Sequence, residues 1–188
     1  MRRGTLIVLA GPSGVGKGSV VQRLRSRDPE GLVYSVSVTS RAPRRDERDG
    51  VDYHFISDQT FDRMIAEGAL LEWAEVVGHR SGTPVAFVHE TRDSGRDVLL
   101  ELDVKGAQQV RAREPAAVLI FLVPPSFEEL EGRLRGRETE DEVAIQRRLA
   151  TARWELQQEG SFDHVVVNDD LERAANEVAA IIEASHTR

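Results

Sequence analysis

The chain has 188 residues and a mass of 20.9 kDa, which is enough for one domain with a hydrophobic core. Hydrophobic residues make up 40% and charged residues 30%, so collagen-like and wholly disordered classes are excluded. Cysteine is absent, which excludes disulfides, zinc ribbons, thiol nucleophiles and iron–sulfur clusters. The net charge of -7 disfavours a nucleic-acid partner.

The first apolar run, Leu6–Ala10, predicts a buried strand. It follows two arginines, but it is too short for the core of a signal peptide, and Gly11-Pro12 ends it. No later run approaches the length of a membrane span. We therefore expect no membrane partner and a cytoplasmic location.

A glycine-rich loop follows this strand and precedes a helix that we expect over Gly18–Arg27. The loop consists of Gly11, Pro12, Ser13, Gly14, Val15, Gly16, Lys17, Gly18 and Ser19. Gly11, Gly16 and Lys17 fit the P-loop pattern, in which backbone N–H groups cradle phosphate oxygens. The lysine then reaches the outer phosphates of a nucleotide such as ATP. A glycine-rich connection without a ligand is the weaker alternative.

One position of the loop departs from the strict pattern. Gly18 stands where P-loop NTPases carry the hydroxyl that binds Mg²⁺. We therefore expect Mg²⁺ to be held mainly by nucleotide phosphates and water, without a dedicated metal ligand, and Ser19 to bond a phosphate. The same variant occurs in nucleoside monophosphate kinases and points away from motor and switch NTPases.

The segment 34–83 has a different pattern and predicts an insertion on the sheet of a core formed by residues 1–33 and 84–188. Ser35–Thr39 alternates in polarity, which predicts a half-exposed strand. A charged loop over Arg41–Gly50 follows, then a short helix over Phe61–Glu67 and a strand over Leu70–Val77.

Beyond the insertion, apolar runs again alternate with helical patterns. Strands are expected at Val98–Leu102, Val118–Val123 and Val165–Val167, and helices at Gly106–Arg113, Phe127–Arg135, Val143–Gln158 and Leu171–Ala184. Capping signatures begin at Ser126 and Thr139. Strands that are apolar throughout predict an α/β fold whose parallel sheet is covered by helices on both faces.

The charged loop carries Arg41 and Arg44, and Tyr53 follows shortly after. A guanidinium group binds phosphate as a bidentate fork, and a tyrosine hydroxyl adds a donor. Such a loop taken alone is usually a solvated surface. Beside a P-loop, a site for a second phosphate is favoured.

Across nearly its whole length, the sequence resembles guanylate kinase. The blocks that carry the resemblance are Gly11–Ser19, Ser35–Arg44, Gly50–Tyr53, Leu71–Glu75, Gly82–Pro84, Leu100–Asp103, Pro124–Ser126, Gly136–Arg137 and Val167–Asp170. The resemblance implies a P-loop NTPase fold with a small α+β GMP-binding insertion and a helical lid at about 126–158. It also implies transfer of the γ-phosphate of ATP to GMP.

The resemblance implies roles for individual residues around GMP. Arg41, Arg44 and Tyr53 are expected to hold the phosphate, and Ser37, Glu72, Thr83 and Asp103 to surround the guanine. Guanine presents N1–H and N2–H₂ side by side, so Glu72 can accept from both, and Ser37 can donate to O6. Adenine N1 is an acceptor that repels this carboxylate, so we expect strong discrimination between the bases.

Arginines of the predicted lid suit the transfer step. Arg133 and Arg137 are four residues apart and share a helix face, and Arg148 comes on the next helix. The resemblance implies that they surround the transferring phosphoryl group together with Lys17, and that Asn168 belongs to the adenine-side loop. Arginines on a closing lid align the phosphates, cancel negative charge and exclude water.

Two positions differ from the family pattern. Ser81 replaces a tyrosine that donates to the GMP phosphate, and its side chain is too short for the same reach. The neighbouring Arg80 is a candidate to replace that donor. In the lid, Glu138 replaces a glycine, which is expected to affect lid flexibility.

Two other functions are compatible with parts of this pattern. A P-loop kinase with another phosphate-ester acceptor is disfavoured by the Glu72 and Ser37 pair. A non-catalytic guanylate-kinase-like domain that binds phosphopeptides is disfavoured by the intact P-loop and the lid arginines. Both a monomer and a homo-oligomer are compatible with the sequence.

Overall fold

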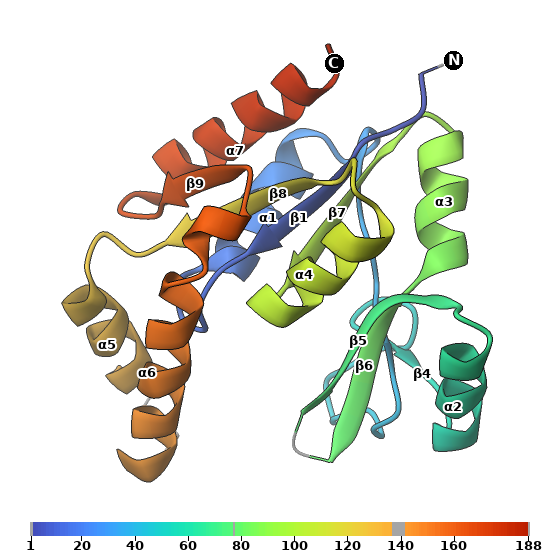
Figure 1. Cartoon of the computed structure of the whole chain (residues 1–188), viewed down its shortest axis with the longest axis horizontal. Helices are drawn as coiled ribbons and strands as arrows, with labels where there is room; N and C mark the ends of the chain where they lie inside the picture. Colours follow the sequence, from blue (N-terminus) through green and yellow to red (C-terminus); the bar gives the residue numbers. More distant parts are fainter. Residues whose placement is uncertain (1, 77, 137–141, 188) are drawn as a thin grey trace.

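A five-stranded parallel sheet forms the centre of the protein, and the computed structural model describes residues 2–76, 78–136 and 142–187 (Figure 1). Its strands, in spatial order, are β2 (Leu32–Tyr34), β7 (Asp97–Leu102), β1 (Leu6–Ala10), β8 (Val118–Val123) and β9 (His164–Val167). All neighbouring pairs run parallel. The α/β architecture that the apolar strands predict is confirmed.

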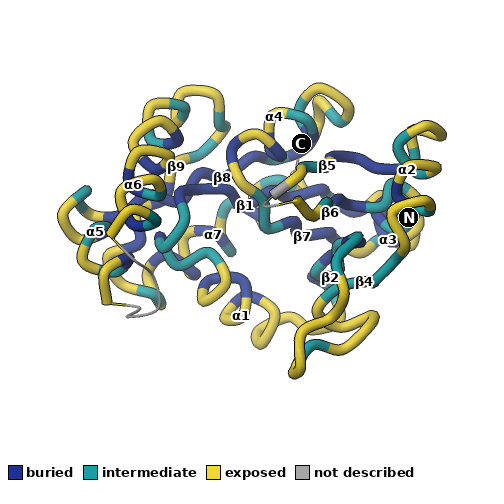
Figure 2. Tube along the Cα trace, turned by 90° about the horizontal axis from the view of Figure 1, so that it is seen from below, coloured by how far each residue is buried: buried dark blue, intermediate teal, exposed yellow. Residues whose placement is uncertain are grey.

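Helices cover both faces of this sheet. On one face lie α1 (Lys17–Arg27) and α7 (Leu171–Ser185), and on the other lie α3 (Val85–Asp93) and α4 (Val104–Arg113). Side chains alternate between the faces of a strand, so Ile7 and Leu9 pack with the first pair and Leu6 and Val8 with the second. Figure 2 shows the central strands β1, β7 and β8 as mostly buried, between helices with exposed outer surfaces.

A second sheet of four strands lies below the first in Figure 1. Its order is β4 (His54–Phe55), β3 (Val38–Thr39), β6 (His79–Pro84) and β5 (Leu70–Val76). Helix α2 (Asp58–Ala66) packs on this sheet through Phe61, which shares a small core with Val38. The side-chain amide of Gln109 in α4 bonds both backbone groups of Trp73 in β5, at 3.1 and 3.0 Å. These bonds join the small sheet to the central one.

Helices α5 (Phe127–Arg135) and α6 (Glu142–Leu156) extend together to one side of the central sheet (Figure 1). The Ser126 hydroxyl accepts a hydrogen bond from the backbone N–H of Glu129 at 3.1 Å, which is the cap that the sequence predicts. The second predicted cap, Thr139, lies outside the described residues. Within the described ranges, no helix combines the length and the apolar composition needed to cross a membrane.

The strand predicted over Ser35–Thr39 is wrong in its extent. Strand β2 ends at Tyr34, and Ser35 continues its pairing by donating to the Leu99 carbonyl at 3.1 Å. Only Val38–Thr39 pairs in the second sheet. The chain crosses from the central sheet to the second sheet between Ser35 and Val38, so the alternating polarity does not come from one continuous strand.

Strand β6 and helix α3 have no counterpart among the predicted elements. The β6 sequence, His79–Pro84, carries no apolar stripe, and the strand is stabilised by pairing with β5 on one edge and β3 on the other. Helix α4 begins two residues earlier than predicted because the Asp103 carboxylate accepts from the Gly106 N–H at 2.7 Å.

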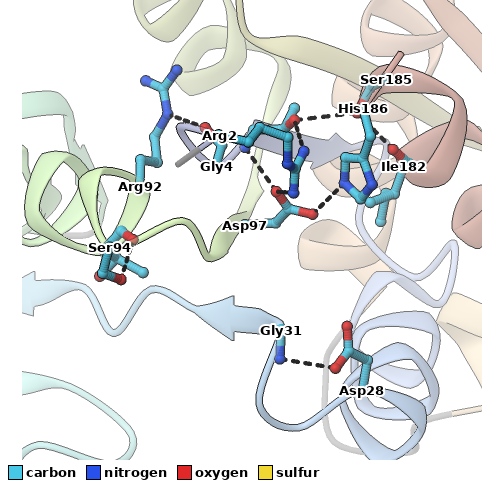
Figure 3. A network of polar contacts seen from close by, with 12 residues as sticks. Arg2, Gly4, Asp28, Gly31, Arg92, Ser94, Asp97, Ile182, Ser185 and His186 are labelled. Carbon is cyan, nitrogen blue, oxygen red and sulfur yellow. Dashed lines mark hydrogen bonds and ion pairs between the residues drawn. The ribbon is translucent and has the colours of Figure 1, made fainter.

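A network at the amino ends of the strands ties the two chain termini together (Figure 3). Asp97, the first residue of β7, is buried. Its carboxylate accepts hydrogen bonds from Arg2 Nη2 at 3.0 Å and from the Thr5 N–H at 2.8 Å. It also contacts His186 Nε2 at 2.6 Å. The N-terminal segment, the central sheet and the end of α7 therefore meet at one carboxylate.

Candidate active site

Two adjoining cavities open at the carboxyl ends of the central strands, where parallel α/β sheets bind ligands. The first, of about 350 Å³, is lined by Lys17, Tyr34, Ser37, Asp52, Tyr53, Glu72, Ala74, Ser81, Gly82, Glu101, Leu102 and Asp103. The second, of about 360 Å³, is lined by Gly11, Ser13, Lys17, Asp103, Arg147, Arg148, Thr151 and Glu155. Lys17 and Asp103 belong to both linings, so the cavities meet at the P-loop lysine.

The P-loop turns between β1 and α1 in a conformation that requires glycine. Gly16 has φ +99°, and a Cβ there would lie 2.5 Å from Asn168 Nδ2. A Cβ on Gly11 would lie 2.3 Å from the Leu122 carbonyl oxygen. Both positions therefore exclude larger residues sterically, and the loop brings its backbone close to its neighbours.

The ammonium group of Lys17 rests on the loop itself. Its Nζ donates to the carbonyls of Gly11 at 2.7 Å and Pro12 at 3.2 Å. Burial lowers the pKa of Lys17, whereas the charges of Glu101, Glu155 and Asp103 oppose that shift. A compact cation is thus held between two cavities and among carboxylates, where an anionic ligand would find a charge partner.

Asn168 lies behind the loop. It is buried, and its side-chain amide donates to the Val15 carbonyl at 2.7 Å. This bond, together with the close approach to Gly16, fixes the shape of the P-loop.

Glu72 is the buried carboxylate of the first cavity, with 5% of its surface exposed. Strand pairing places it opposite Thr83, whose hydroxyl donates to Oε1 at 2.7 Å. A Cβ on Gly106 would lie 3.2 Å from Oε2, so this glycine leaves room for the second oxygen. Burial, with the nearby charge of Asp103, raises the pKa of Glu72 to about 7.

The residues expected around guanine come together in the structure. Ser37 and Asp103 line the same cavity as Glu72. Thr83 is buried and lies behind the carboxylate, so it orients Glu72. Asp103 is held as the N-cap of α4, with its Oδ1 bonded to Gly106.

Two of the residues expected at the acceptor phosphate are close together. The Arg41 guanidinium lies 4.9 Å from the centre of the Tyr53 ring and bonds both oxygens of Glu47 at 2.6 Å. Hydrogen bonds from Arg41 and Arg44 lower the pKa of Glu47 to about 2. Arg44 is exposed and donates its backbone N–H to Glu47 at 2.9 Å. Glu47 thus organises the basic loop, and Tyr53 lines the cavity.

Arg80 does not replace the donor that Ser81 lacks. Its guanidinium pairs with Asp58 at 2.8 Å and with Asp62, and it lies 4.9 Å from the ring centre of Phe61. These partners belong to α2, so Arg80 fastens that helix to the small sheet. Ser81, the next residue, faces the cavity, as alternation along a strand requires.

Two arginines of the predicted lid lie against the P-loop. Arg133 donates to the carbonyls of Val15 at 3.4 Å and Asn168 at 3.1 Å, and Arg148 donates to the Ser13 hydroxyl at 2.5 Å. Arg137 and Glu138 lie outside the described residues. The structure therefore brings two cations from α5 and α6 to the same loop as Lys17.

Among the cavity-lining residues that are absent from the sequence-based expectations, three carry ionisable groups whose pKa is raised by burial. They are Tyr34 and Glu101 in the first cavity and Glu155 in the second. Burial raises the pKa of Glu101, and a charged residue inside an apolar strand was a signal that could have found it. Glu155 is buried on α6, and no local pattern distinguishes it from the other acidic residues of that helix.

Comparisons with known proteins find similar sequences along nearly the whole chain. The guanylate kinase family model matches residues 3–185. The chain is 50% identical over 186 residues to a guanylate kinase of Halalkalibacterium halodurans, covering 99% of this chain and 91% of that protein. It is 57% identical over 171 residues to a guanylate kinase of Parasynechococcus marenigrum, covering 91% of this chain and 93% of that protein.

A solved structure extends the similarity to three dimensions. The crystal structure of guanylate kinase from Anaplasma phagocytophilum superposes with a TM-score of 0.79 at 32% identity, covering 100% of this chain and 89% of that one.

Proposed function

Because the chain belongs to the guanylate kinase family, we propose that it transfers the γ-phosphoryl group of ATP to GMP in the cytoplasm, giving ADP and GDP. The observation that carries this proposal is the buried carboxylate of Glu72 in a cavity that also reaches Lys17. Glu72 can recognise a guanine edge, and Lys17 can hold phosphates.

Base selection follows from the surroundings of Glu72. Thr83 occupies one side of Oε1, which leaves the carboxylate to accept from guanine N1–H and N2–H₂. Ser37 on the same wall can donate to O6. An adenine would place its N1 lone pair against a buried carboxylate and leave that charge unpaired, which is strongly unfavourable.

The P-loop and the lid arginines act on the phosphates. Phosphoryl transfer requires alignment of donor and acceptor and cancellation of negative charge more than covalent chemistry by the protein. Lys17 can leave the carbonyls of Gly11 and Pro12 for the outer phosphates of ATP. Arg133 and Arg148 contact the loop and can bind the same phosphates. We assign the acceptor phosphate to Arg41, Arg44 and Tyr53.

The residues around Gly18 fit a magnesium ion bound through phosphates and water. Gly18 offers no side-chain oxygen, and a Cβ there would lie 3.8 Å from both carboxylate oxygens of Glu101. A carboxylate at that distance can orient water molecules of the ion's shell. Bound Mg²⁺ neutralises charge on the β- and γ-phosphates. Among the described residues, no group of three or more acidic, His or Cys side chains could hold a metal.

The proposal is tested by measuring ADP release with GMP, AMP, CMP or no acceptor. We expect turnover with GMP that greatly exceeds turnover with the other acceptors. Glu72→Gln should raise the KM for GMP and leave the KM for ATP unchanged. Glu75→Gln, on the exposed side of the same strand, is the matched control and should behave as wild type. Equal rates with AMP and GMP would contradict the proposal.

A further inference from the structure

Tyr34 is a polar group of the first cavity that the mechanism above does not use. It is the last residue of β2 and pairs with Leu99 in the middle of β7. Its side chain lines the cavity together with Lys17 and Tyr53. The phenol therefore borders the same cavity as the P-loop lysine and the Glu72 carboxylate.

The ring of Tyr34 is held firmly. It packs against the hydrophobic core beneath α1, and the Arg25 guanidinium of that helix lies 5.2 Å from the ring centre. A ring fixed on both sides gives its hydroxyl a defined position. Such a group is suited to contact a ligand at low entropic cost.

The hydroxyl has unused bonding capacity. Within the described part of the chain, it makes no hydrogen bond to another residue. Burial and the nearby groups Glu101 and Tyr53 raise the pKa of Tyr34 to about 12, so the phenol stays protonated at neutral pH and can donate. A phosphate presents only acceptor oxygens and is the matching partner.

We propose that the Tyr34 hydroxyl binds the acceptor substrate by donating a hydrogen bond to a phosphate oxygen of GMP. This inference rests on the proposed function. The attacking oxygen of the acceptor phosphate must come within roughly 3–3.5 Å of the phosphorus of the γ-phosphate, which Lys17 holds. Tyr34 lines the same cavity as Lys17 and Tyr53, and it is close enough to Tyr53 for the two phenols to interact electrostatically, so its hydroxyl borders the site assigned to the acceptor phosphate.

The short side chain of Ser81 supports the proposal that Tyr34 contacts the phosphate. Ser81 lines the same cavity, and Arg80 beside it is committed to α2. The phosphate therefore needs a donor from another element, and Tyr34 supplies one from β2.

The test is the binding of GMP and of guanosine to wild type and Tyr34→Phe, measured by calorimetry. Phenylalanine keeps the ring and its contact with Arg25 and removes only the donor. We expect Tyr34→Phe to bind GMP roughly tenfold more weakly, the effect of losing one hydrogen bond to a charged group. Guanosine lacks the phosphate, so its affinity should not change. Tyr53→Phe is the positive control and should show the same pattern.

Kinetics supply the second measurement. Tyr34→Phe should raise the KM for GMP about as much as it weakens binding and leave the KM for ATP unchanged. Ser81→Tyr in the Tyr34→Phe background should recover part of the loss, because it returns a donor to the same cavity. A rise in the KM for ATP, or equal weakening of guanosine and GMP, would overturn the assignment, as would unchanged GMP binding. If wild type binds GMP no better than AMP, the proposed function itself fails, which is a separate outcome.

Discussion

Strand β7 carries charged side chains at both of its ends, and the two ends satisfy them differently. At the amino end, the Asp97 carboxylate meets Arg2, Thr5 and His186 within 3.0 Å (Figure 3). At the carboxyl end, Glu101 borders a cavity instead, and burial raises its pKa. The carboxylate at the amino end is hydrogen-bonded within the protein, whereas the carboxylate at the carboxyl end faces a cavity.

The two ends of the strand therefore contribute differently to the stability of the fold and to its function. A buried carboxylate with all its partners stabilises the fold, whereas a buried ionisable group facing a cavity costs stability until a ligand binds. Glu72, which lines the same cavity as Lys17, shows that cost, since its pKa is raised to about 7. Substitutions at the carboxyl end should therefore lower activity without lowering stability, and substitutions at the amino end should lower stability without changing activity.

The largest effect is expected at Lys17. Lys17→Ala removes the only lysine of the P-loop and should lower kcat roughly 10²–10³-fold, the usual loss for one group that stabilises transferred charge. The glycines form the turn without it, so the melting temperature should stay close to that of wild type.

Lys17→Arg sharpens the same experiment. A planar guanidinium cannot replace a compact ammonium that fits between the carbonyls of Gly11 and Pro12. This variant should be nearly as inactive as Lys17→Ala. Near-normal turnover by Lys17→Arg would refute the P-loop assignment.

Glu72→Gln should impair GMP binding and also stabilise the protein at alkaline pH. Glutamine keeps one acceptor but turns an NH₂ toward the guanine donors, so we expect about 1.5–3 kcal/mol of lost GMP affinity. The measurement is the KM for GMP at saturating ATP.

The stability effect has a defined sign. The pKa of Glu72 is raised from 4.5 to about 7 in the folded protein, so the folded state binds more protons between these pH values. The free energy of unfolding therefore falls as pH rises from 4.5 to 7, by about 3 kcal/mol for this group. Glu72→Gln removes that loss, so denaturant melts at pH 8 should show a more stable variant. Equal stability of variant and wild type at pH 5 and pH 8 would show that the carboxylate carries no such cost.

Elements with a strong local pattern were predictable from the sequence. Strand β1 and helix α1 follow from an apolar run, a glycine-rich loop and an apolar helix face. The P-loop lysine followed from the same pattern. Strand β6 was not predictable, because pairing with β3 and β5 creates it and its own residues lack an apolar stripe.

The same distinction applies to the site. Glu72 could be proposed from the resemblance, but its raised pKa depends on contacts with residues distant in sequence, such as Asp103. The pairing of Arg80 with Asp58 and Asp62 reverses the role suggested for Arg80, since those residues come from another element. Tyr34 has no motif of its own, and only the fold brings it to the cavity.

Asp97→Ala tests the amino end. The change leaves the Thr5 N–H without its partner and removes the tie between Arg2 and His186. We expect a loss of about 2 kcal/mol, which corresponds to a melting temperature lower by roughly 4–8 °C. Below the melting range, kcat and both KM values should match wild type. A changed KM for GMP with an unchanged melting temperature would contradict the assignment of stability to the amino end and of activity to the carboxyl end.

The smallest expected effect concerns Ser81, on the cavity wall that faces the carboxyl end. Ser81→Tyr restores the longer donor of the family pattern and should lower the KM for GMP by up to tenfold, since one hydrogen bond to a charged group contributes about 1.5 kcal/mol. Arg80→Ala is the control, because Arg80 points to α2 and should affect stability but not GMP. The two substitutions should therefore act additively in a two-by-two cycle at saturating ATP. A gain from Ser81→Tyr that depends on Arg80 would mean that both side chains reach the acceptor phosphate. No gain in either background would place β6 too far from that phosphate for a tyrosine to bind it.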